Sequence, residues 1–160
     1  MINKLFLYLL NRKPNQEEYK LLQNKNHRQI NNYIIILEEY KDFLEKQKFI
    51  ITNTLINKIG IIDNDIIIHK LMNILRDNTY NYEILEKIIN NKKTQIKNTI
   101  DNQIIKLLGN KIEGFDYNEF YIIFFENNFD YKNLEFIIVN SYSFKEYVEK
   151  EIDVLYEKLF

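Results

Sequence analysis

The chain has 160 residues, a length that suits one domain. Its 46% hydrophobic and 28% charged residues exclude an intrinsically disordered chain, and the absence of cysteine excludes disulfides and thiolate metal sites. The net charge of −1 argues against a nucleic-acid binder, because neutralisation of phosphates favours a basic excess.

The composition also carries a signature of the source genome. The chain contains 28 isoleucines and 23 asparagines, but no alanine and only 3 glycines. Residues with AT-rich codons dominate, which indicates an AT-rich genome such as that of a large DNA virus, an organelle, an endosymbiont or a protist. Mutation pressure chose many of these side chains, so a single Asn or Ile is weak evidence for chemistry.

The first part of the chain shows the spacing of helices. Apolar residues recur mostly at three- and four-residue steps, which is the helical period. A first helix is expected over Ile2–Leu10, and Pro14 suits the first turn of a second one. A longer helix is expected from about Gln29. A further helical stretch runs to about Ile59, where Gly60 suits a helix end.

The middle of the chain predicts three more helices. Asp63 is a suitable N-cap for a helix that runs through Leu75. A short helix is expected over 84–89 and a longer one over 94–108. The polar segment 90–93 is expected to form a turn between them.

Two capping patterns mark helix starts in the last part of the chain. Asp116 with Glu119 and Ser143 with Glu146 have the spacing of capping boxes. The helices expected here cover 120–125, 133–139 and 144–159, and the second of them has a strand over 135–139 as its alternative.

These elements together predict an all-α fold. We expect a single domain over residues 1–160, a compact bundle of about eight to ten short helices. Helix spacings also suggest three stacked helical triplets, over 2–47, 64–110 and 115–160, with an inserted segment 48–63. Stacking would give the triplets one continuous core. The alternative is a chance alignment of helices in an Ile-rich chain.

The first triplet carries a resemblance to a known family. An apolar helix is followed by Arg-Lys-Pro-Asn at 12–15, and Glu-Glu-Tyr-Lys stands at 38–41. Residues 5–47 resemble a small helical repeat domain of unknown function, found in bacterial surface and secreted proteins and in giant-virus proteins. That family usually has Asp where Asn15 stands here. The resemblance implies a helical fold and no particular activity.

No catalytic, cofactor-binding or metal-binding residue is expected. His69 follows Asp65 by one helical turn, which could hold a metal or orient a base, but the same spacing is common on helix surfaces. A calcium loop starting at Asp63 would need Gly and Glu where Ile68 and Ile74 stand. The few glycines cannot form a phosphate-binding loop. We therefore expect no cofactor and no enzyme activity.

Aromatic residues gather in the last third of the chain. Their concentration predicts either the core of the third triplet or a protein-binding face, since aromatic residues are enriched at interfaces. The candidates for partner binding are Phe115, Tyr117, Tyr121, Phe125, Phe129, Tyr131 and Tyr142.

The sequence favours a non-enzymatic structural or interaction protein, for example a minor component of a large assembly such as a virus particle. The alternative is a regulatory helical protein that binds a partner helix in a groove, as Bcl-2-like host modulators do. The expected partners are proteins, among them further subunits or copies of this chain, and neither nucleic acid nor a membrane span is expected. No signal peptide is visible, so we expect a soluble protein inside a cell or a particle.

Overall fold

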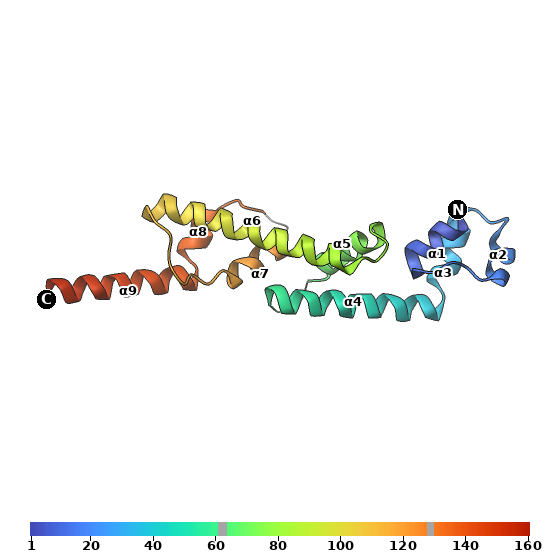
Figure 1. Ribbon diagram of the computed structural model, residues 1–160, viewed down its shortest axis with the longest axis horizontal. Coiled ribbons are helices and arrows are strands. Elements are labelled where there is room, and N and C mark those ends of the chain that lie inside the picture. Colours follow the sequence, from blue (N-terminus) through green and yellow to red (C-terminus); the bar gives the residue numbers. More distant parts are fainter. Residues whose placement is uncertain (61–63, 128–129) are drawn as a thin grey trace. The chain divides into compact units, whose positions relative to one another are not determined.

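A computed structural model describes residues 1–60, 64–127 and 130–160 (Figure 1). These residues form nine α-helices and no strand, which confirms the predicted all-α class. The helices are α1 (Ile2–Leu10), α2 (Gln16–Leu22), α3 (His27–Ile35), α4 (Glu38–Ile59), α5 (Asp65–Asp77), α6 (Tyr82–Leu108), α7 (Asn118–Glu126), α8 (Leu134–Val139) and α9 (Tyr142–Leu159). Because α8 covers residues 135–139, the alternative of a strand there is wrong.

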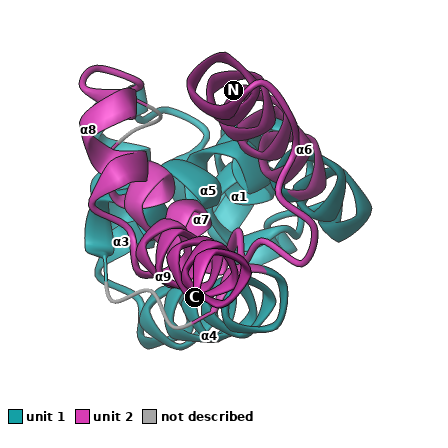
Figure 2. Ribbon diagram, turned by 90° about the vertical axis from the view of Figure 1, so that its left-hand side faces the viewer, with its two compact units in different colours: residues 1–58, 63–89 teal, residues 59–62, 90–160 magenta. Residues whose placement is uncertain are grey.

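The chain divides into two compact units (Figure 2). Unit 1 comprises Met1–Lys58 and Asp63–Ile89, and unit 2 comprises Ile59–Ile62 and Asn90–Phe160. Helix α6 therefore contributes its first turns to unit 1 and its remainder to unit 2. The three predicted triplets have other boundaries, and they stay a prediction.

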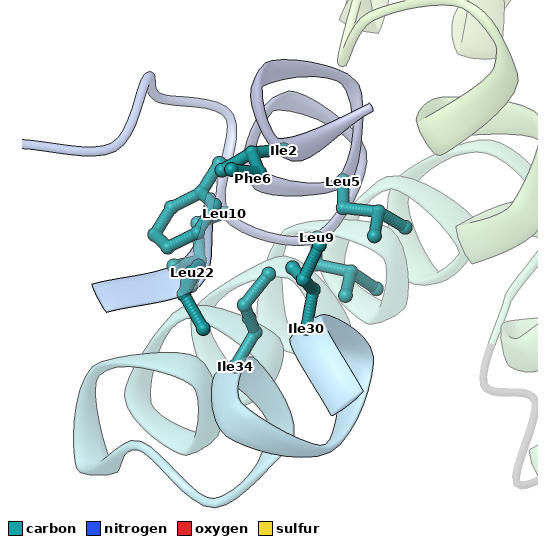
Figure 3. Close-up of a cluster of buried hydrophobic side chains, with 8 residues drawn as sticks. All are labelled: Ile2, Leu5, Phe6, Leu9, Leu10, Leu22, Ile30 and Ile34. Carbon is teal, nitrogen blue, oxygen red and sulfur yellow. The ribbon is translucent and has the colours of Figure 1, made fainter. Parts of the chain in front are cut away.

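Unit 1 has a core built around α1. This helix is apolar on most of its faces, because six of its nine residues are Ile, Leu or Phe. Full burial of such side chains stabilises a fold by roughly 1.5–3 kcal/mol each. The buried cluster consists of Ile2, Leu5, Phe6, Leu9 and Leu10 from α1, Leu22 from α2, and Ile30 and Ile34 from α3 (Figure 3).

Asparagine side chains start the next two helices of unit 1. Asn15 accepts a hydrogen bond from the Glu18 N–H at 2.8 Å, so α2 starts after it, and the prediction that Pro14 lies in the first turn is wrong. Pro14 precedes the cap, where its missing N–H costs nothing. Asn26 forms a full capping box with Gln29, which makes α3 begin before the predicted start at about Gln29.

A glycine follows the end of α4, and an asparagine side chain caps the start of α5. Helix α4 ends at Ile59, as predicted, and Gly60 follows it with φ +112°, a conformation that L side chains rarely adopt. The predicted cap Asp63 lies outside the described residues. Helix α5 is capped by Asn64, which accepts hydrogen bonds from the Ile66 and Ile67 N–H groups at 3.0 and 3.3 Å.

Helix α6 runs without a break through residues 90–93, so the predicted polar turn there is wrong. Neither Gly nor Pro interrupts this segment, and Lys is a good helix former. Ile89 and Ile96 are both buried and lie two turns apart, which keeps them on one face of the helix. The apolar stripe thus continues past the polar residues, and tertiary packing decides the conformation.

The two capping boxes predicted in the last part of the chain are also wrong. Tyr117 is the N-cap of α7 and makes no capping bond with its side chain, whereas Ser141 caps α9 by accepting from the Phe144 N–H at 3.2 Å. The predicted partners make other contacts. Glu119 accepts a hydrogen bond from the Ser143 N–H at 3.2 Å, which ties the start of α7 to the start of α9.

Candidate functional site

The C-terminal helix α9 changes character along its length. Its first two turns pack into unit 2, where Phe144 is buried and Tyr147 and Val148 are half-buried. From residue 151 to residue 160 every side chain is exposed. Figure 1 shows this part of α9 extending past the other helices of unit 2. We call residues 151–160 the distal segment.

The distal segment exposes large apolar side chains. Ile152 is 59% exposed, Leu155 is 57% exposed and Leu159 is 69% exposed. A helical segment this short is not stable in water by its own propensity, because most helices are held by packing of an apolar face. The full set of large apolar residues exposed there is Ile152, Val154, Leu155, Tyr156, Leu159 and Phe160.

Four apolar residues of α9 form one stripe. Val148, Ile152, Leu155 and Leu159 follow one another at steps of four, three and four residues. This is the spacing by which two helices pack along a shared seam. Because a heptad seam needs both helices, the stripe is a surface to which a second helix can bind. We call these four residues the α9 stripe.

A hollow of about 390 Å³ lies beside this stripe in unit 2. Its walls come from the end of α6, where Leu108 is the apolar contributor, and from the stripe residues Val148, Ile152 and Leu155. Glu151 and Lys158 also line it. The hollow therefore combines apolar lining residues with charges of both signs, which is typical of the surroundings of a protein contact.

The aromatic candidates for partner binding have different environments. Phe115, Tyr121 and Phe125 are buried in unit 2, so little of these three rings is open to solvent. Tyr117 and Tyr131 are half-buried, and Phe129 lies outside the described residues. Tyr142, the first residue of α9, is 73% exposed. The ring stacking of Phe115 on Phe120, with centroids 5.5 Å apart, is core packing of unit 2.

A buried carboxylate lies next to this aromatic core. The Tyr117 hydroxyl donates a hydrogen bond to the Asp101 carboxylate, and the Lys111 ammonium lies 3.7 Å from the same group. Burial, together with this hydrogen bond, raises the pKa of Tyr117 above its usual value, so the phenol stays a donor. Lys97 lies over the Tyr117 ring, 5.5 Å from its centre. These contacts attach the segment after α6 to α6 itself, which is a structural role.

A second surface lies in unit 1, in a groove of about 600 Å³ between α4 and α5. Tyr40, Leu44 and Met72 give it apolar walls. Its charged lining is mainly basic, with Asp65 as the acidic member among Lys48, Lys70 and Arg76. His69 also lies in this lining and is exposed.

Arg76 lines the groove and contacts two tyrosines. Its Nη2 donates to the Tyr40 hydroxyl at 3.3 Å, and its guanidinium lies 5.8 Å from the centre of the Tyr8 ring. The Nε of Arg76 is buried and has no hydrogen-bond partner among the described residues.

Within the described parts of the chain no group of three His, Cys, Asp or Glu residues is arranged to hold a metal ion.

An ionic cluster around Arg12 joins three helices of unit 1. The Arg12 guanidinium donates to both carboxylate oxygens of Glu39, at 2.6 and 2.7 Å, and to both of Glu18, at 3.1 Å each. The paired guanidinium holds the pKa of Glu39 below its usual value. Its cationic face also lies 5.2 Å from the centre of the Phe6 ring. Segments 12–15 and 38–41, which carry the family resemblance, thus meet in the folded unit.

Comparison of the chain with protein-family models, with curated proteins and with solved structures gave no match. The structure defines the fold class alone: the described residues form an all-α protein with two compact helical units. In the described ranges no helix is long and apolar enough to cross a membrane. The resemblance of residues 5–47 to the helical repeat domain stays a prediction.

Sequence reasoning did not single out the distal segment of α9. The helix itself was expected over 144–159, and the spacing of the α9 stripe was legible in the sequence. What the sequence alone does not tell is which apolar stripe the fold covers and which it leaves open. The sequence pattern pointed to the aromatic residues in the last third of the chain instead, and most of those that the structure describes are buried or half-buried.

Proposed function

We propose that this chain is a non-enzymatic interaction protein that joins a larger assembly by burying the apolar face of α9. The observation that carries the proposal is the exposure of every residue from 151 to 160 on a helix with an apolar stripe. A virus particle is one such assembly, and the AT-rich composition of the chain agrees with a viral source.

The energetics of the distal segment favour binding. Removing one large apolar side chain from water contributes roughly 1.5–3 kcal/mol when burial is complete. Ile152, Leu155 and Leu159 each keep more than half of their surface in solvent, so most of this free energy is still available to a partner. A partner that covers the stripe also stabilises the helical conformation of the segment.

The proposal is tested by photo-cross-linking in the native source. A photoreactive amino acid is placed at Leu155, on the stripe, and in a second version at Glu157, on the opposite side of the same helix turn. We expect discrete cross-linked species from position 155 and few from position 157. If position 155 yields no discrete species, or the same pattern as position 157, the α9 face is not a binding surface.

A second candidate function is the binding of an acidic amphipathic helix in the groove of unit 1. The observation that favours it is the combination of apolar walls with the basic residues Lys48, Lys70 and Arg76. This is the groove-binding alternative drawn from the sequence.

Titration with an acidic amphipathic peptide of about 15 residues tests this second function, with the thermal stability of the chain as the readout. We expect stabilisation that weakens in a Lys48→Glu variant and persists in Lys46→Glu, since Lys46 is exposed and does not line the groove. Equal effects of the peptide on both variants, or no effect on the unmodified chain, would contradict groove binding.

A further inference from the structure

The α9 stripe is complementary to itself when two copies of the helix run in opposite directions. Antiparallel pairing places Val148 opposite Leu159 of the second copy and Ile152 opposite Leu155 of the second copy. The same two layers recur by symmetry, so four apolar layers form with no polar residue between them. The overlap covers 148–159, a length of about 18 Å.

The charges beside the stripe fit this antiparallel arrangement. In an antiparallel seam the residues that flank the stripe on one side face their own counterparts, so Glu151 lies opposite Lys158 of the second copy. Two-fold symmetry gives this ion pair twice. On the other side Glu149 faces Tyr156 of the second copy, so no like charges meet.

A parallel pair would not use these charges. Parallel helices place Glu151 next to Tyr156 of the second copy, which leaves Glu151 and Lys158 without opposite charges. In the single chain both residues are exposed, and neither forms an ion pair with any other described residue. Charge complementarity therefore selects the antiparallel orientation.

The hollow beside the stripe suits the end of such a partner helix. Antiparallel pairing brings Leu159 of the second copy to Val148, and Val148 lines the hollow together with Leu108. Leu108 is itself exposed, so its apolar surface would gain a partner. The contact thus extends from α9 onto the end of α6 within unit 2.

From these observations we infer that the distal segment of α9 binds a second copy of this chain as an antiparallel helix pair, with reciprocal Glu151–Lys158 ion pairs. This inference rests on the proposed function and names its partner. Because one short helix from each copy supplies most of the contact, the interface is smaller than a standard one of about 800 Å² per partner, and dissociation in the micromolar range or above is expected.

Sedimentation of the purified full chain, at concentrations from about 5 to 500 µM, tests the inference. We expect a reversible monomer–dimer equilibrium. Leu155→Glu should weaken the dimer at least about a hundredfold, because each copy contributes Leu155 to a central layer. Residue 155 is exposed in the single chain, so this variant keeps its fold.

Charge reversal then tests the orientation. Glu151→Lys and Lys158→Glu should each weaken dimerisation about tenfold, because each puts like charges opposite one another twice. The double variant Glu151→Lys with Lys158→Glu should recover the original affinity to within about threefold. Glu157→Lys is the matched control, since it makes the same charge change on the far side of the helix and should change affinity less than about twofold.

The outcomes separate the inference from the proposed function. A chain that stays monomeric over this range, or a double variant that fails to recover, overturns the antiparallel self-pairing. If the chain stays monomeric while the photoprobe at position 155 captures a discrete partner, the second copy is the wrong occupant and the interaction function stands. If both experiments are negative, both proposals fall.

Discussion

At the scale of single residues, Arg12 contacts side chains of α1, α2 and α4 in unit 1. Replacing it with Ala should destabilise the protein by about 1–2 kcal/mol, because two carboxylates lose a bidentate partner at a site that is partly open to solvent. Arg12→Lys should recover only part of this, since Lys cannot match the planar fork.

Urea unfolding of the three proteins measures these differences. Arg28→Ala is the control, because Arg28 is exposed and should give a change within about 0.5 kcal/mol. If Arg12→Ala were as mild as this control, the ionic cluster would not stabilise unit 1.

The same cluster predicts a pH dependence through Glu39. Its pKa lies below the ordinary value of 4.5 in the folded protein, because Arg12 binds the charged form. A lowered folded-state pKa gives stability that is present above pH 4.5 and is lost as the pH falls through the folded-state pKa. Wild type should therefore be more stable than Glu39→Gln at neutral pH, and the difference should shrink in acid.

Unfolding curves of both proteins between neutral and acidic pH measure this difference. If the difference in stability between wild type and Glu39→Gln stayed constant as the pH fell, or grew, the assigned role of the Arg12–Glu39 pair would be contradicted.

At the scale of helices and turns, asparagine forms several of the helix boundaries. Asn15, Asn26 and Asn64 cap helices with their side chains. Asn11 and Asn133 adopt positive φ at helix ends, 54° and 59°, a conformation that Asn tolerates better than most residues. In a chain with three glycines, asparagine supplies both kinds of helix boundary.

Replacement of Asn26 by Ala should destabilise the protein by about 0.5–2 kcal/mol, because the Gln29 N–H loses its acceptor. Asn32→Ala makes the same change inside the same helix at an exposed position, where Ala is the better helix former. That control should be neutral or slightly stabilising in thermal unfolding. Equal losses for both variants would show that the capping box does not stabilise α3.

The helices show what the sequence can and cannot tell. The bounds of α1 and the end of α4 were predicted, because an apolar run and a glycine are strong local signals. The asparagine caps were not predicted, because the abundance of Asn in this chain makes a single Asn weak evidence for a helix start. The supposed turn at 90–93 was misread because its polar residues lie on a helix whose buried face continues past them.

At the scale of the whole molecule, the two compact units offer different surfaces. Unit 1 carries a basic groove between α4 and α5, whereas unit 2 carries the apolar stripe of α9. The stripe residues were readable in the sequence as helical. Their exposure was not, because burial depends on which tertiary neighbours cover each face. The aromatic segment illustrates this, since Phe115 and Phe125 are buried although aromatic enrichment alone also suits an interface.

The central claim is that the distal segment of α9 is covered in the assembled state. Hydrogen–deuterium exchange of residues 148–160 tests it most directly, by comparing the isolated chain at low concentration with the assembly from the native source. Burial of the stripe should slow exchange of these amides at least about tenfold, because the helix gains the packing that it lacks alone. Exchange at the same rate in both samples would contradict the claim that α9 is the binding surface.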